Sequence, residues 1–130
     1  MPATYLDSSA LVKLAVEEPE SGALRRYLRR RRPLVSSALA RTEVLRALLP
    51  QGDEGVARGR AVLGSLELVR VNDRVLNAAG TLTPPHLRSL DAIHLATVGQ
   101  LGADVGEIVT YDERMKAAAA PLGYKVMSPH

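Results

Sequence analysis

The chain has 130 residues, 46% hydrophobic and 24% charged, with a formal net charge of +3, and this length and composition predict one globular domain over residues 1–130. It contains no Cys, which excludes disulfide frameworks, iron–sulfur sites and thiolate zinc sites, and its three His residues lack metal-ligand spacing. No stretch without charge reaches the roughly 18 residues of a membrane-spanning helix, and Asp7 and Lys13 interrupt any N-terminal signal segment, so we expect a cytoplasmic protein that does not cross a membrane.

The first half of the chain alternates short apolar segments, which predict strands, with longer segments of helical pattern. Six arginines lie between Arg25 and Arg32 on the outer face of the second predicted helix, where they fit either a solvated surface or a polyanionic partner. In chain order, the expected elements are a strand over 3–6, a helix from Ala10 capped by Ser8 or Ser9, a helix over 20–31, a strand over 34–35 followed by Ser36 and Ser37 as a cap, helices over 38–49 and 56–63, and a strand over 66–71.

The second half continues the same alternation and adds a loop with two prolines, which exclude regular structure there. In chain order, the expected elements are a helix capped by Asn72 or Asp73 that runs to about residue 79, the loop over 81–85, a helix over 90–101 capped by Ser89, a strand over 108–111, a helix over 113–120 and an edge strand over 125–127. Short apolar strands that alternate with helices are joined by right-handed crossovers, which make the strands parallel. We therefore predict an α/β fold, a three-layer α/β/α sandwich with a short, mainly parallel sheet of four to five strands.

Four acidic residues are predicted at the same edge of this sheet. Asp7 follows the first strand, and Asp112 follows the strand that precedes the last helix. Asp91 and Glu43 each lie in the first two turns of a predicted helix. Helices that follow parallel strands begin at the carboxyl edge of the sheet, where ligands bind in such folds. The four carboxylates are therefore expected to converge on one cleft.

A cluster of four carboxylates needs a compensating charge, because two unit charges about 4 Å apart repel by roughly 4 kcal/mol at an effective dielectric constant near 20. Raised pKa values or a bound divalent cation relieve this repulsion, and oxygen ligands without His or Cys favour Mg²⁺, with Mn²⁺ as the alternative. Without the four acids the chain would hold 17 basic and 10 acidic residues, a formal net charge of +7, which suits a nucleic-acid substrate. The chemistry that fits is metal-assisted hydrolysis of a phosphodiester bond.

Each of these residues also has an ordinary structural explanation. Taken singly, the acids fit a helix cap (Asp7), a solvated partner of Arg41 or Arg46 (Glu43), a charge in the helix dipole (Asp91) and a turn (Asp112). His94 fits a packed residue or one that orients an acid better than it fits a metal ligand. Arg88 and Arg114 fit either phosphate contacts or solvated surface charges. Only the shared edge of the sheet favours the functional interpretation.

Four short motifs surround the acids. They are Tyr5-Leu6-Asp7-Ser8-Ser9-Ala10-Leu11-Val12-Lys13, then Thr42-Glu43, then Leu90-Asp91-Ala92-Ile93-His94-Leu95-Ala96, and finally Val109-Thr110-Tyr111-Asp112. In this order and at these separations, from about residue 3 to residue 127, they resemble the motifs of PIN-domain ribonucleases, and specifically of VapC-type toxins of type II toxin–antitoxin systems.

The resemblance implies a Mg²⁺-dependent endoribonuclease that cleaves cellular RNA, forms a homodimer and is inhibited by a cognate VapB-type antitoxin that inserts a segment into the cleft. It implies catalytic roles for Asp7, Glu43, Asp91 and Asp112, direct metal contact for Asp7, Asp91 and Asp112, and orientation of the acids by Ser9 and Thr110. A PIN-fold nuclease that processes RNA outside a toxin–antitoxin pair is an alternative with the same motifs.

Two other classes of function are compatible with a similar sheet. A phospho-receiver would have paired acids after the first strand, and a phosphatase would have an Asp-x-Asp pair, whereas Ser8 and Ser9 follow Asp7 here. A non-catalytic RNA-binding module would be better served by neutral or basic residues than by four acids. Cleavage that EDTA stops would favour the nuclease, and tight RNA binding without cleavage would favour the module.

Overall fold

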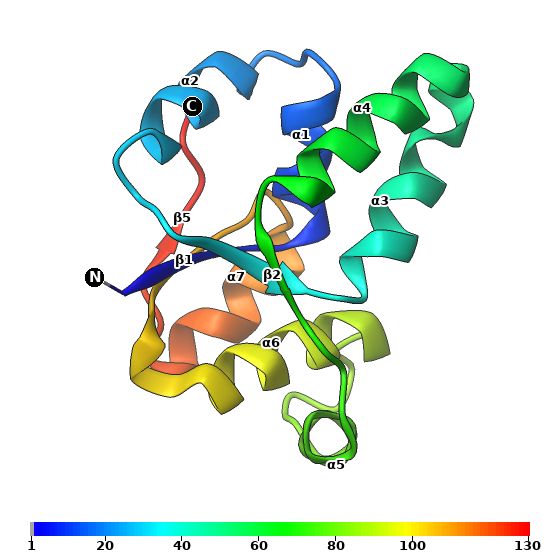
Figure 1. The fold of residues 1–130 in the computed structure, drawn as a ribbon. Helices are drawn as coiled ribbons and strands as arrows, with labels where there is room; N and C mark the ends of the chain where they lie inside the picture. The colour runs from blue at the N-terminus through cyan, green and yellow to red at the C-terminus, as the bar shows by residue number, and fades with distance from the viewer. Residues whose placement is uncertain (1) are drawn as a thin grey trace.

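A parallel five-stranded sheet lies at the centre of the computed structural model, which describes residues 2–130 (Figure 1). In the spatial order β3-β2-β1-β4-β5, the strands are β1 (Ala3–Leu6), β2 (Leu34–Ser37), β3 (Glu67–Val69), β4 (Val105–Val109) and β5 (Val126–Met127). Every neighbouring pair is parallel. The strand order reverses at β1, which has β2 on one side and β4 on the other. Ligands bind at the carboxyl ends of the strands at such a point.

Helices cover both faces of the sheet, which confirms the predicted three-layer sandwich (Figure 1). One layer holds α1 (Ser8–Ala15), α2 (Ser21–Leu28), α3 (Ala40–Leu48) and α4 (Gly52–Gly64), and the other holds α5 (Asp73–Gly80), α6 (Ser89–Leu101) and α7 (Glu113–Ala119). Short 3-10 turns follow three of these helices, at Leu49–Gln51, Gly102–Asp104 and Ala120–Leu122. None of the helices between residues 2 and 130 has the length and apolar composition needed to cross a bilayer.

Neighbouring residues of the central strands divide the core between the two layers. Leu6 and Val109 pack with the layer of α1 to α4, whereas Tyr5 and Ile108 pack with α6 and α7. This division follows from the strand geometry, because successive side chains point to opposite faces of a sheet. All four side chains are almost completely buried, and each such burial stabilises the fold by roughly 1.5–3 kcal/mol. The core therefore fixes β1 and β4 from both faces.

Three helices begin differently from the sequence prediction. Asp7 caps α1 in place of the serines that follow it, because its Oδ1 accepts the N–H of Ala10 at 3.2 Å. The predicted cap of α6, Ser89, is the first residue of the helix, and the N-cap residue Arg88 makes no side-chain cap hydrogen bond. α4 already begins at Gly52, one turn before the predicted start. The first difference matters most, since it places Asp7 at the point where strand becomes helix.

Every strand except β1 differs somewhat from the prediction: β3 spans Glu67–Val69 instead of 66–71, β4 begins at Val105 instead of residue 108, and β5 spans Val126–Met127 instead of 125–127. Two of the differences bear on the site. Ser36 and Ser37 belong to β2 instead of capping the next helix, because they continue the register with β3 and are fully buried. β4 ends at Val109 and not at residue 111, since the chain turns there into α7. Asp112 caps that helix by accepting the N–H groups of its first turn. The turn brings Asp112 beside the carboxyl end of β1.

Gly59 lets α4 lie close against α3. A Cβ atom at this position would come within 2.5 Å of Leu48 Cδ1 and 3.2 Å of Leu45 Cδ2, and Leu48 is fully buried. We expect Gly59→Ala to lower the free energy of unfolding by about 1–2 kcal/mol, because overpacking outweighs the helix-propensity gain of Ala. Gly64→Ala in the same helix, where a Cβ meets nothing within 4 Å, should be neutral or slightly stabilising. Urea unfolding measures both, and equal effects would contradict the prediction.

Candidate active site

All four predicted acids line one cleft of about 230 Å³ at the carboxyl edge of the sheet. Asp7 joins β1 to α1, and Asp112 caps α7 after β4. Glu43 lies in the first turn of α3, and Asp91 lies in the first turn of α6. The structure thus brings together the side chains that the sequence placed at one edge, while their catalytic and metal-binding roles stay predictions.

Asp7 is the most buried of the four acids, with 4% of its surface exposed. Ser9 Oγ donates to its Oδ1 at 2.6 Å, and Thr110 Oγ1 donates to its Oδ2 at 2.6 Å. Burial raises the pKa of Asp7 above its ordinary value, although these two hydrogen bonds act in the opposite direction. Both residues predicted to orient the acids therefore contact Asp7, and the carboxylate still lacks full compensation for its burial.

Arg88 joins the other two aspartates. Its Nε donates to Asp91 Oδ2 at 2.8 Å, and one terminal nitrogen donates to Asp112 Oδ2 at 2.6 Å. Burial opposes the ionisation of Asp112, but the N–H groups of Met115 and Arg114 and the nearby Arg88 hold the pKa of that carboxyl below its ordinary value. The guanidinium therefore supplies positive charge between two carboxylates that are predicted to bind metal.

Arg114, the second predicted phosphate contact, does not line this cleft. Its side chain is exposed and lines a neighbouring hollow of about 660 Å³, to which Arg88 and His86 also contribute. Arg88 thus lies at the border of both hollows. A phosphate contact by either arginine stays a prediction.

Glu43 is held at one of its two carboxylate oxygens. Ser8 Oγ donates to Oε1 at 2.5 Å, and His94 Nε2 lies 2.6 Å from the same oxygen. Burial opposes the ionisation of Glu43, yet the contacts with His94 and Ser8 and the charge of Arg88 hold its pKa below the ordinary value. Within residues 2–130, both hydrogen bonds to this carboxylate end on Oε1, so Oε2 is left for molecules that enter the cleft.

Two residues around Glu43 were not identified as functional from the sequence. The sequence suggests only a helix cap for Ser8 and a core position for Tyr5, whose hydroxyl lies 2.7 Å from His94 Nδ1. Two consecutive serines after Asp7 were the available signal, since one hydroxyl reaches Asp7 and the other reaches Glu43. For Tyr5, the signal was a polar tip on a buried strand, because a buried tyrosine hydroxyl needs a partner.

The donor set of the cleft suits a hard divalent cation, because carboxylate oxygens are the ligands that Mg²⁺ and Mn²⁺ prefer. Within residues 2–130, however, no three His, Asp or Glu side chains are grouped closely enough to hold a metal ion. The side chain of Arg88 lies between Asp91 and Asp112 and keeps these two carboxylates apart. Glu43 is paired with His94. The carboxylates therefore suit a divalent cation chemically. In this arrangement the guanidinium of Arg88 provides the positive charge between Asp91 and Asp112.

Comparisons with known proteins identify the family to which the chain belongs. The sequence pattern of the PIN domain matches residues 4–121. Ribonuclease VapC46 of Mycobacterium tuberculosis is 61% identical over 129 residues, which cover 99% of each chain. The crystal structure of VapC20 of the same organism, described as a sarcin–ricin loop cleaving toxin, matches with a TM-score of 0.78 at 17% identity and covers 98% of this chain and 100% of that one. A toxin–antitoxin complex from Klebsiella pneumoniae matches with a TM-score of 0.75 at 19% identity over 98% of both chains.

The structural matches show the fold, since their sequence identities are low, and the sequence matches show the family. The PIN pattern spans nearly the whole chain and includes all four acids of the cleft. The identity to VapC46 extends from end to end. The resemblance predicted from the four motifs is therefore confirmed, and the chain belongs to the PIN-domain family as a VapC-type protein.

Proposed function

We propose that the chain is a divalent-metal-dependent endoribonuclease, the toxin of a VapBC pair, in which residues 1–130 act as one nuclease domain. The observation that carries the proposal is the convergence of four acids from four separate segments on one cleft of a chain with a net charge of +3. The identity to a protein named ribonuclease VapC46 supports the same activity here. The substrate class is RNA, and hydrolysis of its phosphodiester bonds is the reaction.

The roles of the acids follow from their surroundings. Asp7, Asp91 and Asp112 are the side chains that would hold Mg²⁺ or Mn²⁺. A bound divalent cation supplies charge stabilisation at the phosphate and increases the acidity of a bound water. Glu43 is ionised, and its Oε2 is placed to accept a proton from water in the cleft. The hydroxyls that donate to Asp7 fix the orientation of its carboxylate.

Arg88 has two successive roles in this proposal. In the arrangement described above it offsets the charges of Asp91 and Asp112. A divalent cation held by Asp91 and Asp112 would compete with the guanidinium for these carboxylates, because two cations repel each other at this distance. The side chain of Arg88 is half exposed, so when displaced it is available to a phosphate of the RNA, as the sequence predicts.

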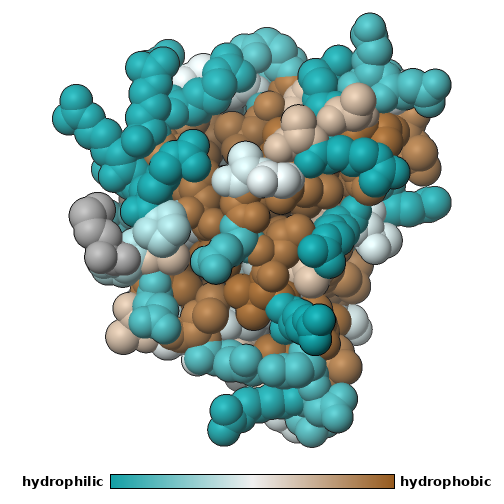
Figure 2. All heavy atoms as spheres, in the orientation of Figure 1, coloured by the Kyte–Doolittle hydropathy of each residue, from teal (hydrophilic) through white to brown (hydrophobic). Residues whose placement is uncertain are grey.

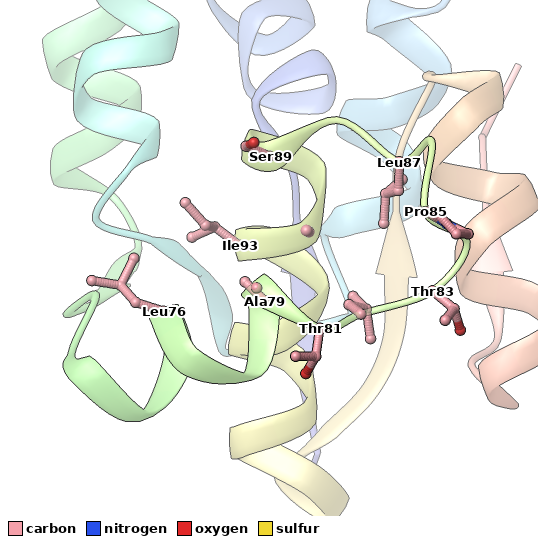
Figure 3. Close-up of a pocket in the computed structure, with 11 residues that line it drawn as sticks. Leu76, Ala79, Thr81, Thr83, Pro85, Leu87, Ser89 and Ile93 are labelled. Carbon is pink, nitrogen blue, oxygen red and sulfur yellow. The ribbon is translucent and has the colours of Figure 1, made fainter.

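The partners proposed with this function are a VapB-type antitoxin and a second copy of the chain, in the cytoplasm where RNA is available. A hollow of about 490 Å³ with a mixed lining adjoins the cleft and shares Ser89 with it, and Leu76, Leu87 and Ile93 contribute apolar surface to it (Figure 3). Figure 2 shows further apolar surface in the middle of one face, framed by hydrophilic side chains. Contiguous exposed apolar surface is typical of protein-binding sites, which supports protein partners here.

The test of the proposed function is RNA cleavage by purified, antitoxin-free protein. Total RNA is incubated with the protein and Mg²⁺ or Mn²⁺, and new RNA ends are mapped. We expect cleavage that EDTA stops. Asp91→Asn should lower the cleavage rate at least about 100-fold, because it removes a charged metal ligand without a change of size.

Glu113→Gln is the matched control. Glu113 is an exposed acid of α7 paired with Lys116 outside the cleft, so its loss should leave cleavage unchanged. Circular dichroism checks that each variant is folded. Full cleavage by Asp91→Asn, or cleavage that continues in EDTA, would contradict the proposal. Tight RNA binding without cleavage would favour a non-catalytic module.

Opposite pKa shifts predict opposite stability effects for two acids of the cleft. Asp7 has a raised pKa in the fold, so its ionisation costs stability as pH rises from about 3.8 through the folded value. Asp112 has a lowered pKa, so it contributes stability above about 3.8 that is lost as pH falls through the folded value. In EDTA at pH 7, Asp7→Asn should therefore raise Tm, and Asp112→Asn should lower it.

Thermal unfolding of both variants between pH 4 and pH 8 checks this pair of predictions. The gain from Asp7→Asn should shrink as the pH approaches 4, because the wild-type carboxyl then becomes neutral as well. The loss from Asp112→Asn should stay nearly constant over this range, because the contribution of Asp112 is lost only below about pH 3.8. Each kcal/mol corresponds to about 4 °C in a domain of this size. A loss of stability for Asp7→Asn at pH 7 would contradict the assignment of a raised pKa.

Competition between Arg88 and the metal predicts a change in metal affinity. Arg88→Met removes the competing charge and keeps the aliphatic stem, so the dissociation constant for Mn²⁺ should fall about 5-fold, as expected for loss of two partly exposed ion pairs. Arg114→Met is the matched control and should leave the constant unchanged, since Arg114 does not line the cleft. Isothermal titration calorimetry measures both. Weaker metal binding by Arg88→Met would contradict this competition.

A further inference from the structure

A buried chain of polar side chains runs from the core to Glu43. The hydroxyl of Tyr5, in β1, lies 2.7 Å from Nδ1 of His94, in α6. Nε2 of the same imidazole lies 2.6 Å from Oε1 of Glu43, in α3. The rings of Tyr5 and His94 also make an edge-to-face contact, with their centroids 5.9 Å apart. Three elements that are distant in the sequence are thereby joined at one carboxylate.

Tyr5 and His94 are almost completely buried. Only 1% of Tyr5 and 2% of His94 are exposed, and although His94 forms part of the cleft wall, both of its ring nitrogens are engaged by Tyr5 and Glu43. A buried imidazole is costly unless both ring nitrogens have hydrogen-bond partners. The other buried positions of this helix, such as Leu95 and Val98, hold apolar side chains. The polar chain ends on an acid of the cleft, which gives it a function beyond packing.

The proton positions in this chain follow from the groups at its two ends. Glu43 is ionised and can only accept, so the hydrogen must lie on His94 Nε2. A neutral imidazole with its hydrogen on Nε2 has a bare Nδ1, so the hydroxyl of Tyr5, 2.7 Å away, donates to that nitrogen. The imidazole is then held in one tautomer by a donor on one side and an acceptor on the other.

Two donors on Oε1 restrict Glu43 more than one would. His94 Nε2 and Ser8 Oγ reach the same oxygen from α6 and α1, so rotation of the carboxylate would break both hydrogen bonds. Oε2 is consequently the oxygen that stays available to water in the cleft. A carboxylate free to rotate would present this oxygen in the required place for only part of the time.

We propose that His94 is a positioning residue, held by Tyr5, that fixes Glu43 with Oε2 available to the attacking water. This inference rests on the proposed function, since it assumes that Glu43 acts in RNA cleavage. It assigns His94 no contact with metal or RNA. Loss of the imidazole should therefore lower kcat and leave the KM for RNA nearly unchanged.

Three variants test the proposal by RNA cleavage in Mg²⁺. His94→Leu should lower kcat about 10- to 100-fold, the usual effect of removing such a supporting hydrogen bond. His94→Gln should recover much of the loss, because its amide nitrogen can donate to Glu43. Tyr5→Phe should lower kcat about 3- to 10-fold, and should have no further effect in the His94→Leu background. His130→Leu, which removes an exposed imidazole outside the cleft, is the control and should behave as wild type.

A second measurement is independent of activity. ¹⁵N NMR of the imidazoles should show His94 protonated at Nε2 and hydrogen-bonded at Nδ1, and the Nδ1 signal should move in Tyr5→Phe. A hydrogen on Nδ1 alone would overturn the proposal, as would equal kcat values for His94→Gln and His94→Leu, or wild-type kcat for His94→Leu. If wild-type protein does not cleave RNA, the proposed function itself fails, and the catalytic role of His94 fails with it. The NMR result then still decides whether the chain of hydrogen bonds exists.

Discussion

Repulsion among four carboxylates at one edge of a parallel sheet is the constraint on which the rest of the structure depends. Different groups of the protein offset the charge of the different acids. Hydroxyl groups hold Asp7, one guanidinium serves both Asp91 and Asp112, and an imidazole and a hydroxyl hold Glu43. These contacts come from every segment around the carboxyl ends of β1 and β4. The cleft is therefore organised by the protein before any ligand enters, and the groups that organise it define what a ligand must replace.

The four acids are not stabilised equally in their ionised forms, and the difference is greatest between Asp7 and Asp112. Asp112 is stabilised in its charged form, whereas Asp7 is buried with neutral donors and its pKa is raised. The missing positive charge is thus greatest near Asp7, at the end of β1, while Arg88 supplies the side of the cleft near α6 and α7. Asp7 is therefore the acid whose ionised form the fold supports least. The ionisation of Asp7 lowers the stability of the fold for that reason, as is common at functional sites.

The sequence predicted the meeting of the acids because topology alone decides it. Residues that follow adjacent parallel strands are neighbours whatever their side chains, so the places of Asp7 and Asp112 followed from the strand pattern. The pairing of Arg88 with Asp112 and of His94 with Glu43 could not be predicted in this way, since these residues lie 24 and 51 positions apart and meet through side-chain conformation. The sequence left the cap of α1 open between Asp7 and the two serines after it, because Asp and Ser cap helices equally well. Ser36 and Ser37 belong to β2 because β3 pairs with them and buries them. The local sequence does not show that a neighbouring strand will do so.

The first turns of α6 unite these contacts in one helix. Arg88, Asp91 and His94 follow one another at intervals of three residues, which places them along one side of the helix. Leu95 and Val98 lie on the adjoining side and pack in the core against the sheet. Because a packed helix moves as a rigid body, a small rotation of α6 would change the contacts of all three polar residues together. The apolar side of α6 therefore sets the distances among the acids as firmly as the hydrogen bonds do. In this helix, the residues that pack in the core also determine where the polar residues of the site lie.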